Sequence, residues 1–240
     1  MNFEKTLILI PTYNERQNIA VLLRALFDIY PKIHVWVIDD SSPDGTAEEV
    51  QTLMKIFPDL TLLSRSKKDG IGGAYKHAFK KLQRRNDIEN IITMDADGSH
   101  DVSYIKDFVS AAEKYDLVVG SRYIPQGTIP QWELWRKALS SFGNIYARSL
   151  TGLRIKDLTS GFICVKADLI KKINFDAITS SGYSYQIEFK YICSQYTSKI
   201  IEMPITFYER KSGASKMSFF IIKEGIKTPL KIFLKKISRT

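Results

Sequence analysis

Long apolar runs are absent from this chain of 240 residues, and no stretch reaches the roughly 18 uninterrupted apolar residues of a membrane-spanning helix. Residues 1–5 also lack the apolar core of a secretory signal peptide and lead directly into a short strand pattern. Cysteine is scarce: Cys164 and Cys193 lie far apart in apolar segments and show no metal-binding spacing. We therefore expect reduced thiols in the core of a cytoplasmic protein.

Histidine is rare as well. His34, His77 and His100 are scattered along the chain, so no histidine stands out as a general base. The rest of the composition is that of an ordinary globular protein, with 44% apolar and 25% charged residues. A chain of this length can bury one sizeable core. The composition therefore predicts a single domain.

The first half of the sequence alternates short apolar strands with helical patterns. Strands are predicted at residues 6–10, 33–38, 60–63, 91–94 and 117–120, and helices follow each of the first four. This alternation predicts an α/β fold, with a mostly parallel sheet and helices on both faces.

The rhythm changes after residue 122. The later segments predict, in order, a helix at 134–150, a strand at 161–165, a helix at 183–195 and a strand at 200–207. We expect one domain over residues 1–216. Its nucleotide-binding half would cover residues 1–122, its acceptor half residues 123–216, and a tail residues 217–240.

Two carboxylates, Asp95 and Asp97, follow the predicted strand at 91–94. Residues two apart in an extended segment point the same way, so both could face one ligand at the carboxyl edge of the sheet. Their hard oxygen donors suit Mg²⁺ or Mn²⁺ bridging to a diphosphate. The alternative is that they only cap the helix predicted to begin near Ser103.

Two more predicted strands end in polar residues. The sequence PTYNE follows the first strand at residues 11–15, and Asp39 and Asp40 follow the second. Three acidic or polar strand ends at one edge predict a site. Asp40 is suited to accept hydrogen bonds from a ribose or a base, and Tyr13 could stack on a nucleobase.

A glycine-rich segment at residues 69–74 opens a helix, which raises the question of a phosphate loop. It lacks the Gly-Lys-Ser/Thr of a Walker loop and the spacing of a dinucleotide fingerprint. We therefore expect close helix packing there. Basic residues in later loops could bind phosphate, although each taken singly could be a solvated surface charge: Arg122, Arg136, Arg210 and Lys216.

Taken in order, these motifs resemble the dolichol-phosphate (polyprenol-phosphate) mannosyltransferases, which are family 2 glycosyltransferases with the Rossmann-like GT-A fold. The resemblance runs from residue 6 to about residue 220. Its motifs are PTYNE at 11–15, DDSSPDGT at 39–46, DADGSH at 95–100, GSRY at 120–123, RKALSS at 136–141, DLTSGF at 157–162, GYSYQIE at 182–188 and RKSGASK at 210–216.

The resemblance implies a set of site residues. GDP-mannose would be held by Pro11, Tyr13, Glu15, Ile38, Asp40, Asp95, Ala96 and Asp97. Asp97 would also bind Mg²⁺ or Mn²⁺, with Ser99 where some members have glutamine. Contacts to the donor or to the acceptor phosphate would come from Arg122, Arg210 and Lys216. Arg136 and Ser140 match an acceptor-phosphate site. The implied catalytic residues are Asp97, Arg122, Arg136 and Arg210.

The implied chemistry follows from the charges involved. A metal ion and basic residues would neutralise the charge that develops on a diphosphate leaving group. The nucleophile would be an oxygen of a polyprenyl (dolichyl) monophosphate, which is already anionic, so no strong general base is required. Direct displacement would invert the sugar, giving a β-linked product from an α-linked donor.

The net charge of +9 lies mostly at the C-terminal end, where residues 210–240 contain nine Lys or Arg and one acidic residue. Apolar residues recur there at helical spacing, with lysines beside them. The apolar stripe consists of Phe219, Ile222, Ile226, Leu230, Phe233 and Ile237, and the lysines are Lys223, Lys227, Lys231 and Lys235. Such a basic amphipathic helix predicts peripheral contact with an anionic membrane surface, here the cytosolic face. The alternatives are packing on the chain's own core or on a partner subunit that anchors it.

Two other functions stay open at this point. The first is a related transferase that uses UDP-glucose or another sugar nucleotide. The second is a basic nucleotide- or nucleic-acid-binding protein without catalysis. The second is disfavoured, because the lysines alternate with an apolar stripe and not with exposed aromatic residues suited to stacking on bases. We expect no nucleic-acid partner.

Overall fold

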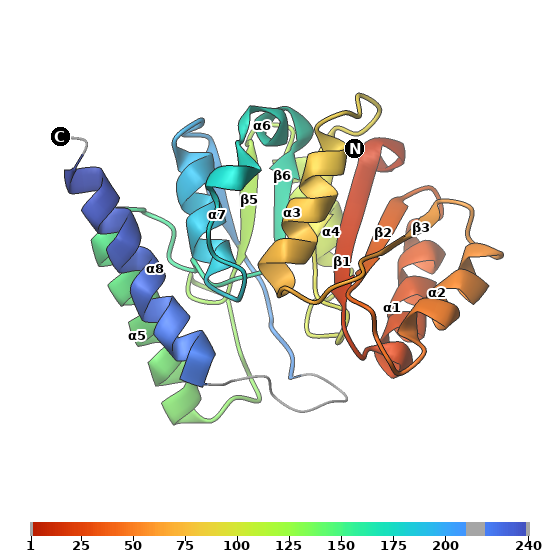
Figure 1. Cartoon of the computed structure of the whole chain (residues 1–240), viewed down its shortest axis with the longest axis horizontal. Helices are drawn as coiled ribbons and strands as arrows, with labels where there is room; N and C mark the ends of the chain where they lie inside the picture. The colour runs from red at the N-terminus through yellow and green to blue at the C-terminus, as the bar shows by residue number, and fades with distance from the viewer. Residues whose placement is uncertain (1, 210–218, 239–240) are drawn as a thin grey trace.

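A computed structural model describes residues 2–209 and 219–238, and a seven-stranded sheet forms its centre (Figure 1). The strand order is β3-β2-β1-β4-β6-β5-β7. Only β6 runs antiparallel to its neighbours, so the expected mostly parallel sheet is confirmed. The strands are β1 (Thr6–Thr12), β2 (His34–Asp39), β3 (Leu60–Ser64), β4 (Asn90–Thr93), β5 (Leu117–Ser121), β6 (Ile163–Lys166) and β7 (Ile200–Pro204).

Helices cover both faces of the sheet, as predicted (Figure 1). Side chains alternate along β1, so that Leu7 and Leu9 join one core while Ile8 and Ile10 join the other. The helices are α1 (Arg16–Ile29), α2 (Thr46–Met54), α3 (Ile71–Leu82), α4 (Tyr104–Ala111), α5 (Leu134–Thr151), α6 (Ala167–Lys172), α7 (Tyr185–Ser194) and α8 (Phe219–Ile237), with 3-10 turns at Phe3–Lys5 and Phe175–Ala177.

The glycine-rich segment before α3 serves close packing, as expected. Gly70 has a φ of +86°, and a Cβ on it would lie 2.4 Å from the backbone oxygen of Ser181. A Cβ on Gly72 would lie 2.9 Å from the Tyr185 side chain. Larger residues would push α3 away from the start of α7. The two cysteines are free and buried, which confirms core thiols, and burial raises the pKa of Cys164 to about 12.

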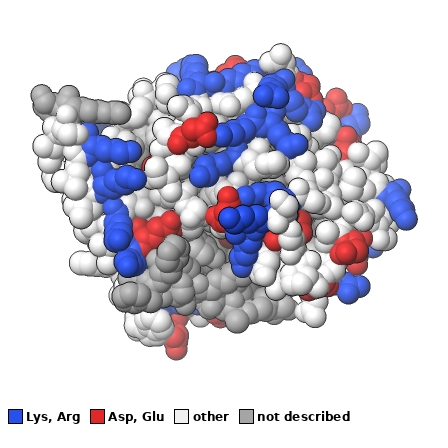
Figure 2. All heavy atoms as spheres, viewed as in Figure 1, with Lys and Arg blue, Asp and Glu red and all other residues white. Residues whose placement is uncertain are grey.

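The predicted C-terminal helix is present as α8, which lies beside α5 (Figure 1). It docks through Thr228 and Ile232, which are buried, and Thr228 Oγ1 lies 3.2 Å from Ser184 Oγ. The alternative in which the apolar stripe packs on the chain's own core is wrong for Ile226, Leu230 and Ile237, which stay exposed. The lysines of α8 are exposed and form a basic band along it (Figure 2). Within the described ranges, no helix is both long and apolar enough to cross a bilayer.

Candidate active site

The carboxyl ends of β1 to β4 lie at one edge of the sheet, because these strands are parallel and in register. Thr12 pairs with Asp39, and Asp39 pairs with Ser64 on the next strand. On the other side of β1, Leu9 pairs with Thr93. The segments that follow these strands therefore emerge side by side, as the sequence predicts.

The two neighbouring aspartates after β2 have different surroundings. Asp39 accepts hydrogen bonds from Thr12 Oγ1 (2.9 Å) and from the backbone N and Oγ of Ser42 (2.9 and 2.5 Å), so it shapes the loop. Asp40 is buried, and its Oδ1 accepts a hydrogen bond from Arg65 Nη1 at 2.6 Å. Burial raises the pKa of Asp40, and Arg65 opposes this rise. Arg65, which also contacts Asp69, is a site residue that the sequence reasoning missed.

The residues after β1 border the same edge. Tyr13 carries the ammonium of Lys68 on one face of its ring, 3.4 Å from the ring centroid, where base stacking is predicted. Glu15 Oε2 accepts a hydrogen bond from Asn18 Nδ2 at 2.9 Å. Pro11 is half-buried, whereas Ile38 is fully buried in the core beneath the site. Of these four residues, Tyr13, Glu15 and Pro11 can present side chains to a ligand, whereas Ile38 cannot.

The loop that carries Asp95 and Asp97 is folded tightly after β4. Asp97 is buried, and its Oδ1 accepts a hydrogen bond from the backbone N of Ser99 at 3.1 Å. The alternative in which these carboxylates cap the next helix is wrong, because Asp101 Oδ1 accepts the hydrogen bond from Ser103 N at 2.8 Å. Ala96 and Ser99 are also buried in this loop. Asp97 therefore shapes its own loop and does not cap α4.

The buried side chain of His100 holds the same loop in place. Its Nδ1 accepts a hydrogen bond from the backbone N of Asp95 at 3.0 Å, and its ring stacks on Phe162 with centroids 4.7 Å apart. Burial lowers the pKa of His100 to about 4, although the Asp97 carboxylate acts to raise it. The imidazole is therefore neutral at physiological pH and its acceptor nitrogen is occupied.

A divalent cation fits the donor atoms of this loop. Within residues 2–209 and 219–238, no group of three or more His, Cys, Asp or Glu could hold a metal ion alone. Mg²⁺ and similar hard cations need only one or two protein carboxylates when substrate phosphates supply further oxygens. Asp97, with Asp95 two residues before it, provides carboxylate donors of this kind. The site therefore suits a metal ion that arrives with a diphosphate.

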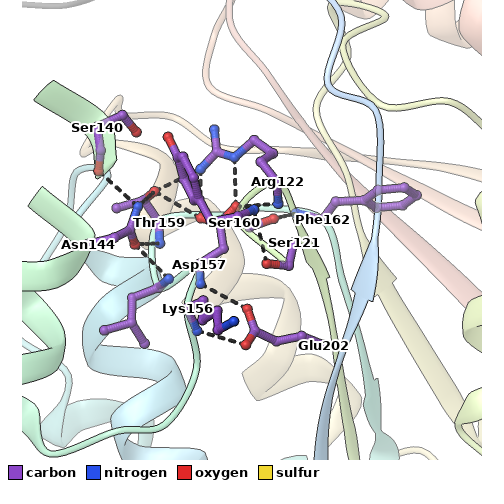
Figure 3. A network of polar contacts seen from close by, with 12 residues as sticks. Ser121, Arg122, Ser140, Asn144, Lys156, Asp157, Thr159, Ser160, Phe162 and Glu202 are labelled. Atoms are coloured by element: carbon purple, nitrogen blue, oxygen red, sulfur yellow. Dashed lines mark hydrogen bonds and ion pairs between the residues drawn. The ribbon is translucent and has the colours of Figure 1, made fainter. Parts of the chain in front are cut away.

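Arg122 lies just past β5 and is held by Asp157 (Figure 3). Its Nε and Nη2 donate to the two carboxylate oxygens at 2.7 and 2.8 Å, and Nη2 also donates to Thr159 Oγ1 at 2.8 Å. Burial raises the pKa of Asp157, but Arg122 outweighs it, and the pKa of this carboxyl is lowered. In the part of the chain that the structure describes, Arg122 Nη1 makes no hydrogen bond, so it can meet a ligand.

The segment around Asp157, residues 156–162, has no regular secondary structure and is held by side chains from distant elements (Figure 3). We call it the Asp157 segment. Its backbone N–H groups donate to Glu202 on β7 and to Asn144 on α5. Its carbonyls accept from Lys190 on α7 and from Thr93 on β4. Sequence reasoning identified the DLTSGF motif but none of these four residues.

Arg136 and Ser140, the predicted acceptor-phosphate pair, lie in the first two turns of α5. The guanidinium of Arg136 stacks on Trp132, 4.0 Å from a ring centroid, and that of Arg122 lies 5.9 Å from the same indole. The two arginines are therefore brought together. The carbonyl of Ser140 accepts a hydrogen bond from Asn144, which links α5 to the Asp157 segment. Arg210 and Lys216 lie outside the described residues.

Comparisons with known proteins point to one family. The family model for glycosyl transferase family 2 matches residues 7–174. An undecaprenyl-phosphate mannosyltransferase from Micrococcus luteus is 40% identical over 92% of this chain and 91% of its own length. A polyprenol monophosphomannose synthase from Mycolicibacterium smegmatis is 38% identical over 93% of this chain and 84% of its own length.

Solved structures support the fold. Glucosyl-3-phosphoglycerate synthase from Mycobacterium tuberculosis, with Mn²⁺ and UDP, superimposes with a TM-score of 0.68 at 13% identity, covering 96% of this chain and 78% of that one. A mannosyltransferase from Pyrobaculum calidifontis, with GDP-Man and Mn²⁺, gives a TM-score of 0.61 at 18% identity over 98% and 64%. The expected GT-A fold is confirmed, and the chain belongs to glycosyl transferase family 2.

Proposed function

We propose that this protein transfers mannose from GDP-mannose to the phosphate of a polyprenyl or dolichyl monophosphate, with inversion at the sugar. One observation carries the proposal: relatives named for this activity match nearly the whole chain at about 40% identity. The site supports it, because an acidic strand edge and a pair of arginines offer places for a nucleotide diphosphate and a second phosphate.

The donor would occupy the acidic edge. Tyr13 and Asp40 would contact the nucleoside, with Pro11, Glu15, Ala96 and the core residue Ile38 shaping the site around it. Asp97, with Asp95, and Ser99 in the same loop would hold Mg²⁺ or Mn²⁺. A divalent ion bound there stabilises the negative charge that develops on the leaving diphosphate.

The acceptor phosphate would meet the arginines. Arg122 Nη1 and the Arg136 guanidinium would bind its oxygens, Ser140 would contact it from α5, and Arg210 and Lys216 would add charge. A phosphate monoester is already anionic at neutral pH, because its second pKa is about 6. It can therefore attack the sugar without a general base, which agrees with a neutral, engaged His100.

A transfer assay with each donor in turn tests this function. The purified protein is incubated with a polyprenyl phosphate, Mg²⁺ or Mn²⁺, and either labelled GDP-mannose or labelled UDP-glucose. We expect lipid-linked mannose from GDP-mannose, loss of product when EDTA is added, and a β-linked sugar by NMR. Transfer from UDP-glucose alone, or an α-linked product, would contradict the proposal.

We further propose that α5 and α8 together rest on the cytosolic face of a membrane. The two helices pack against each other and each exposes large apolar side chains, which together would form one apolar face: Leu134, Trp135, Leu139, Phe142 and Ile145 on α5, and Ile226, Leu230, Leu234 and Ile237 on α8. The exposed lysines of α8 adjoin this apolar face and would attract anionic lipids (Figure 2). Arg136 on α5 would then lie close to the lipid headgroups.

Changing Phe142 to glutamate tests the membrane contact. Phe142 is 70% exposed. Burying a phenylalanine contributes about 1.5–3 kcal/mol, so we expect at least about tenfold weaker binding to vesicles containing anionic lipid, measured by flotation. Val21→Glu is the matched control, since Val21 is 63% exposed but lies on α1. Equal flotation of both variants and the unmodified protein would contradict this placement, as would binding only to a partner subunit.

A further inference from the structure

Lys190 is fully buried in the middle of α7 and belongs to no motif that the proposed function uses. Its Nζ donates hydrogen bonds to the backbone oxygens of Leu158 (3.1 Å) and Ser160 (2.7 Å). Over residues 2–209 and 219–238, it forms no ion pair within 4.0 Å. Lysine is almost never fully buried without a charged partner. The burial of this lysine therefore indicates a specific role for its charge or its hydrogen bonds.

The two carbonyls that Lys190 binds belong to the same short stretch as Asp157 and Thr159, the two side chains that accept hydrogen bonds from Arg122. Leu158 directly follows Asp157, and Thr159, which also accepts from Arg122, lies between Leu158 and Ser160. The N–H groups of the segment are held from the other side by Asn144 and Glu202. Lys190 thus completes the support of the loop that sets the angle of the Arg122 guanidinium.

The charge of Lys190 matters as well as its hydrogen bonds. Asp157 neutralises Arg122, so the pair alone offers a phosphate little net positive charge. Lys190 acts electrostatically on Asp157, whose pKa it helps to lower, and adds a second cation. Burial lowers its pKa to about 7, while Asp157 acts to raise it. The other ionisable groups that face Lys190, with smaller effects, are Arg122, Cys193 and Glu202.

We propose that Lys190 is a positioning residue for phosphate binding: it fixes the Asp157 segment so that Arg122 Nη1 faces the substrate, and its charge offsets Asp157 so that Arg122 acts as a net cation. This role rests on the proposed function. It assigns to α7 a part in the reaction although Lys190 touches no substrate.

Replacing Lys190 by glutamine tests this role, because the amide keeps a donor for the carbonyls but carries no charge. We expect kcat/KM for the polyprenyl phosphate to fall at least about tenfold, less than the roughly 10²–10³-fold loss typical of a direct oxyanion contact. Lys190→Met, which keeps neither donor nor charge, should lose more. Phe189→Leu is the control for a general destabilisation of α7, because Phe189 is the buried neighbour of Lys190 and stacks on Phe79.

The pH dependence of the transfer rate separates a positioning role of Lys190 from an effect on stability alone, and its first arm uses the unmodified protein. Lys190 is charged below a pKa of about 7, so transfer by the unmodified protein should decline as pH rises above 7. Lys190→Gln should lack this alkaline decline. If the unmodified protein transfers mannose but Lys190→Gln matches Phe189→Leu in rate and pH profile, the role of Lys190 is refuted and the proposed function stands. An unmodified protein inactive with every donor refutes the proposed function itself.

Discussion

Replacing Asp97 by asparagine is expected to lower the rate of mannose transfer by about 10³-fold or more while leaving the fold intact. The amide oxygen of asparagine can still accept the hydrogen bond from Ser99 N, so the loop keeps its shape. What would be lost is the negative charge that we propose holds a divalent cation, and with it the stabilisation of the leaving diphosphate.

Single-turnover rates with saturating Mg²⁺ or Mn²⁺ measure this effect, and thermal unfolding verifies the fold. Asp101→Asn is the matched control, since Asp101 lies in the same loop and only caps α4 through Ser103 N. We expect that variant to retain full activity. If Asp97→Asn transferred mannose at the unmodified rate, the acidic edge would not be the metal site.

Replacing Arg122 by methionine is expected to lower the free energy of unfolding by about 3 kcal/mol, and to abolish transfer. Asp157 is fully buried, and removing its bidentate partner leaves a carboxylate that the interior solvates poorly. The double variant Arg122→Met/Asp157→Asn should recover part of the stability but none of the activity, because asparagine is neutral and can still accept from the backbone N of residue 122.

Urea unfolding at several pH values provides the measurement. Arg122 lowers the pKa of Asp157, so the pair stabilises the fold above the ordinary carboxyl pKa of about 3.9. That contribution is lost as pH falls through the lower pKa of the folded state. The difference between the unmodified protein and Arg122→Met should therefore shrink in acid. A difference that is small at neutral pH would mean that Asp157 is stabilised mainly by its other contacts.

Sequence reasoning succeeded where the signal is local. Hydrophobic periodicity located the strands and the long helices, and the acidic residues that follow β1, β2 and β4 emerge at one edge of the sheet, as expected. The six-residue helix α6 was missed because it is too short for its periodicity to show. The predicted strand at 200–207 ends at Pro204, because its partner strand β5 ends at Ser121, the residue that pairs with Pro204.

Sequence reasoning failed where a residue acquires its role only through tertiary contacts. Arg65 lies 25 residues from Asp40, and nothing in its neighbourhood marks the pairing. Lys190 and Asn144 look like ordinary polar positions on helices, although both are buried. On α8 the helical period was right, but the sequence did not show which residues dock the helix: Thr228 hydrogen-bonds to two serines, and Ile232 joins the core.

The support of the Asp157 segment has a consequence for how the protein folds. Its partners Thr93, Asn144, Lys190 and Glu202 span more than a hundred positions of the chain. Contacts between such distant residues incur the entropy of closing long loops before they stabilise anything, and they form slowly. We therefore expect Arg122 to reach its folded orientation late, and a nascent chain that ends before β7 lacks Glu202, one of the partners that hold the Asp157 segment.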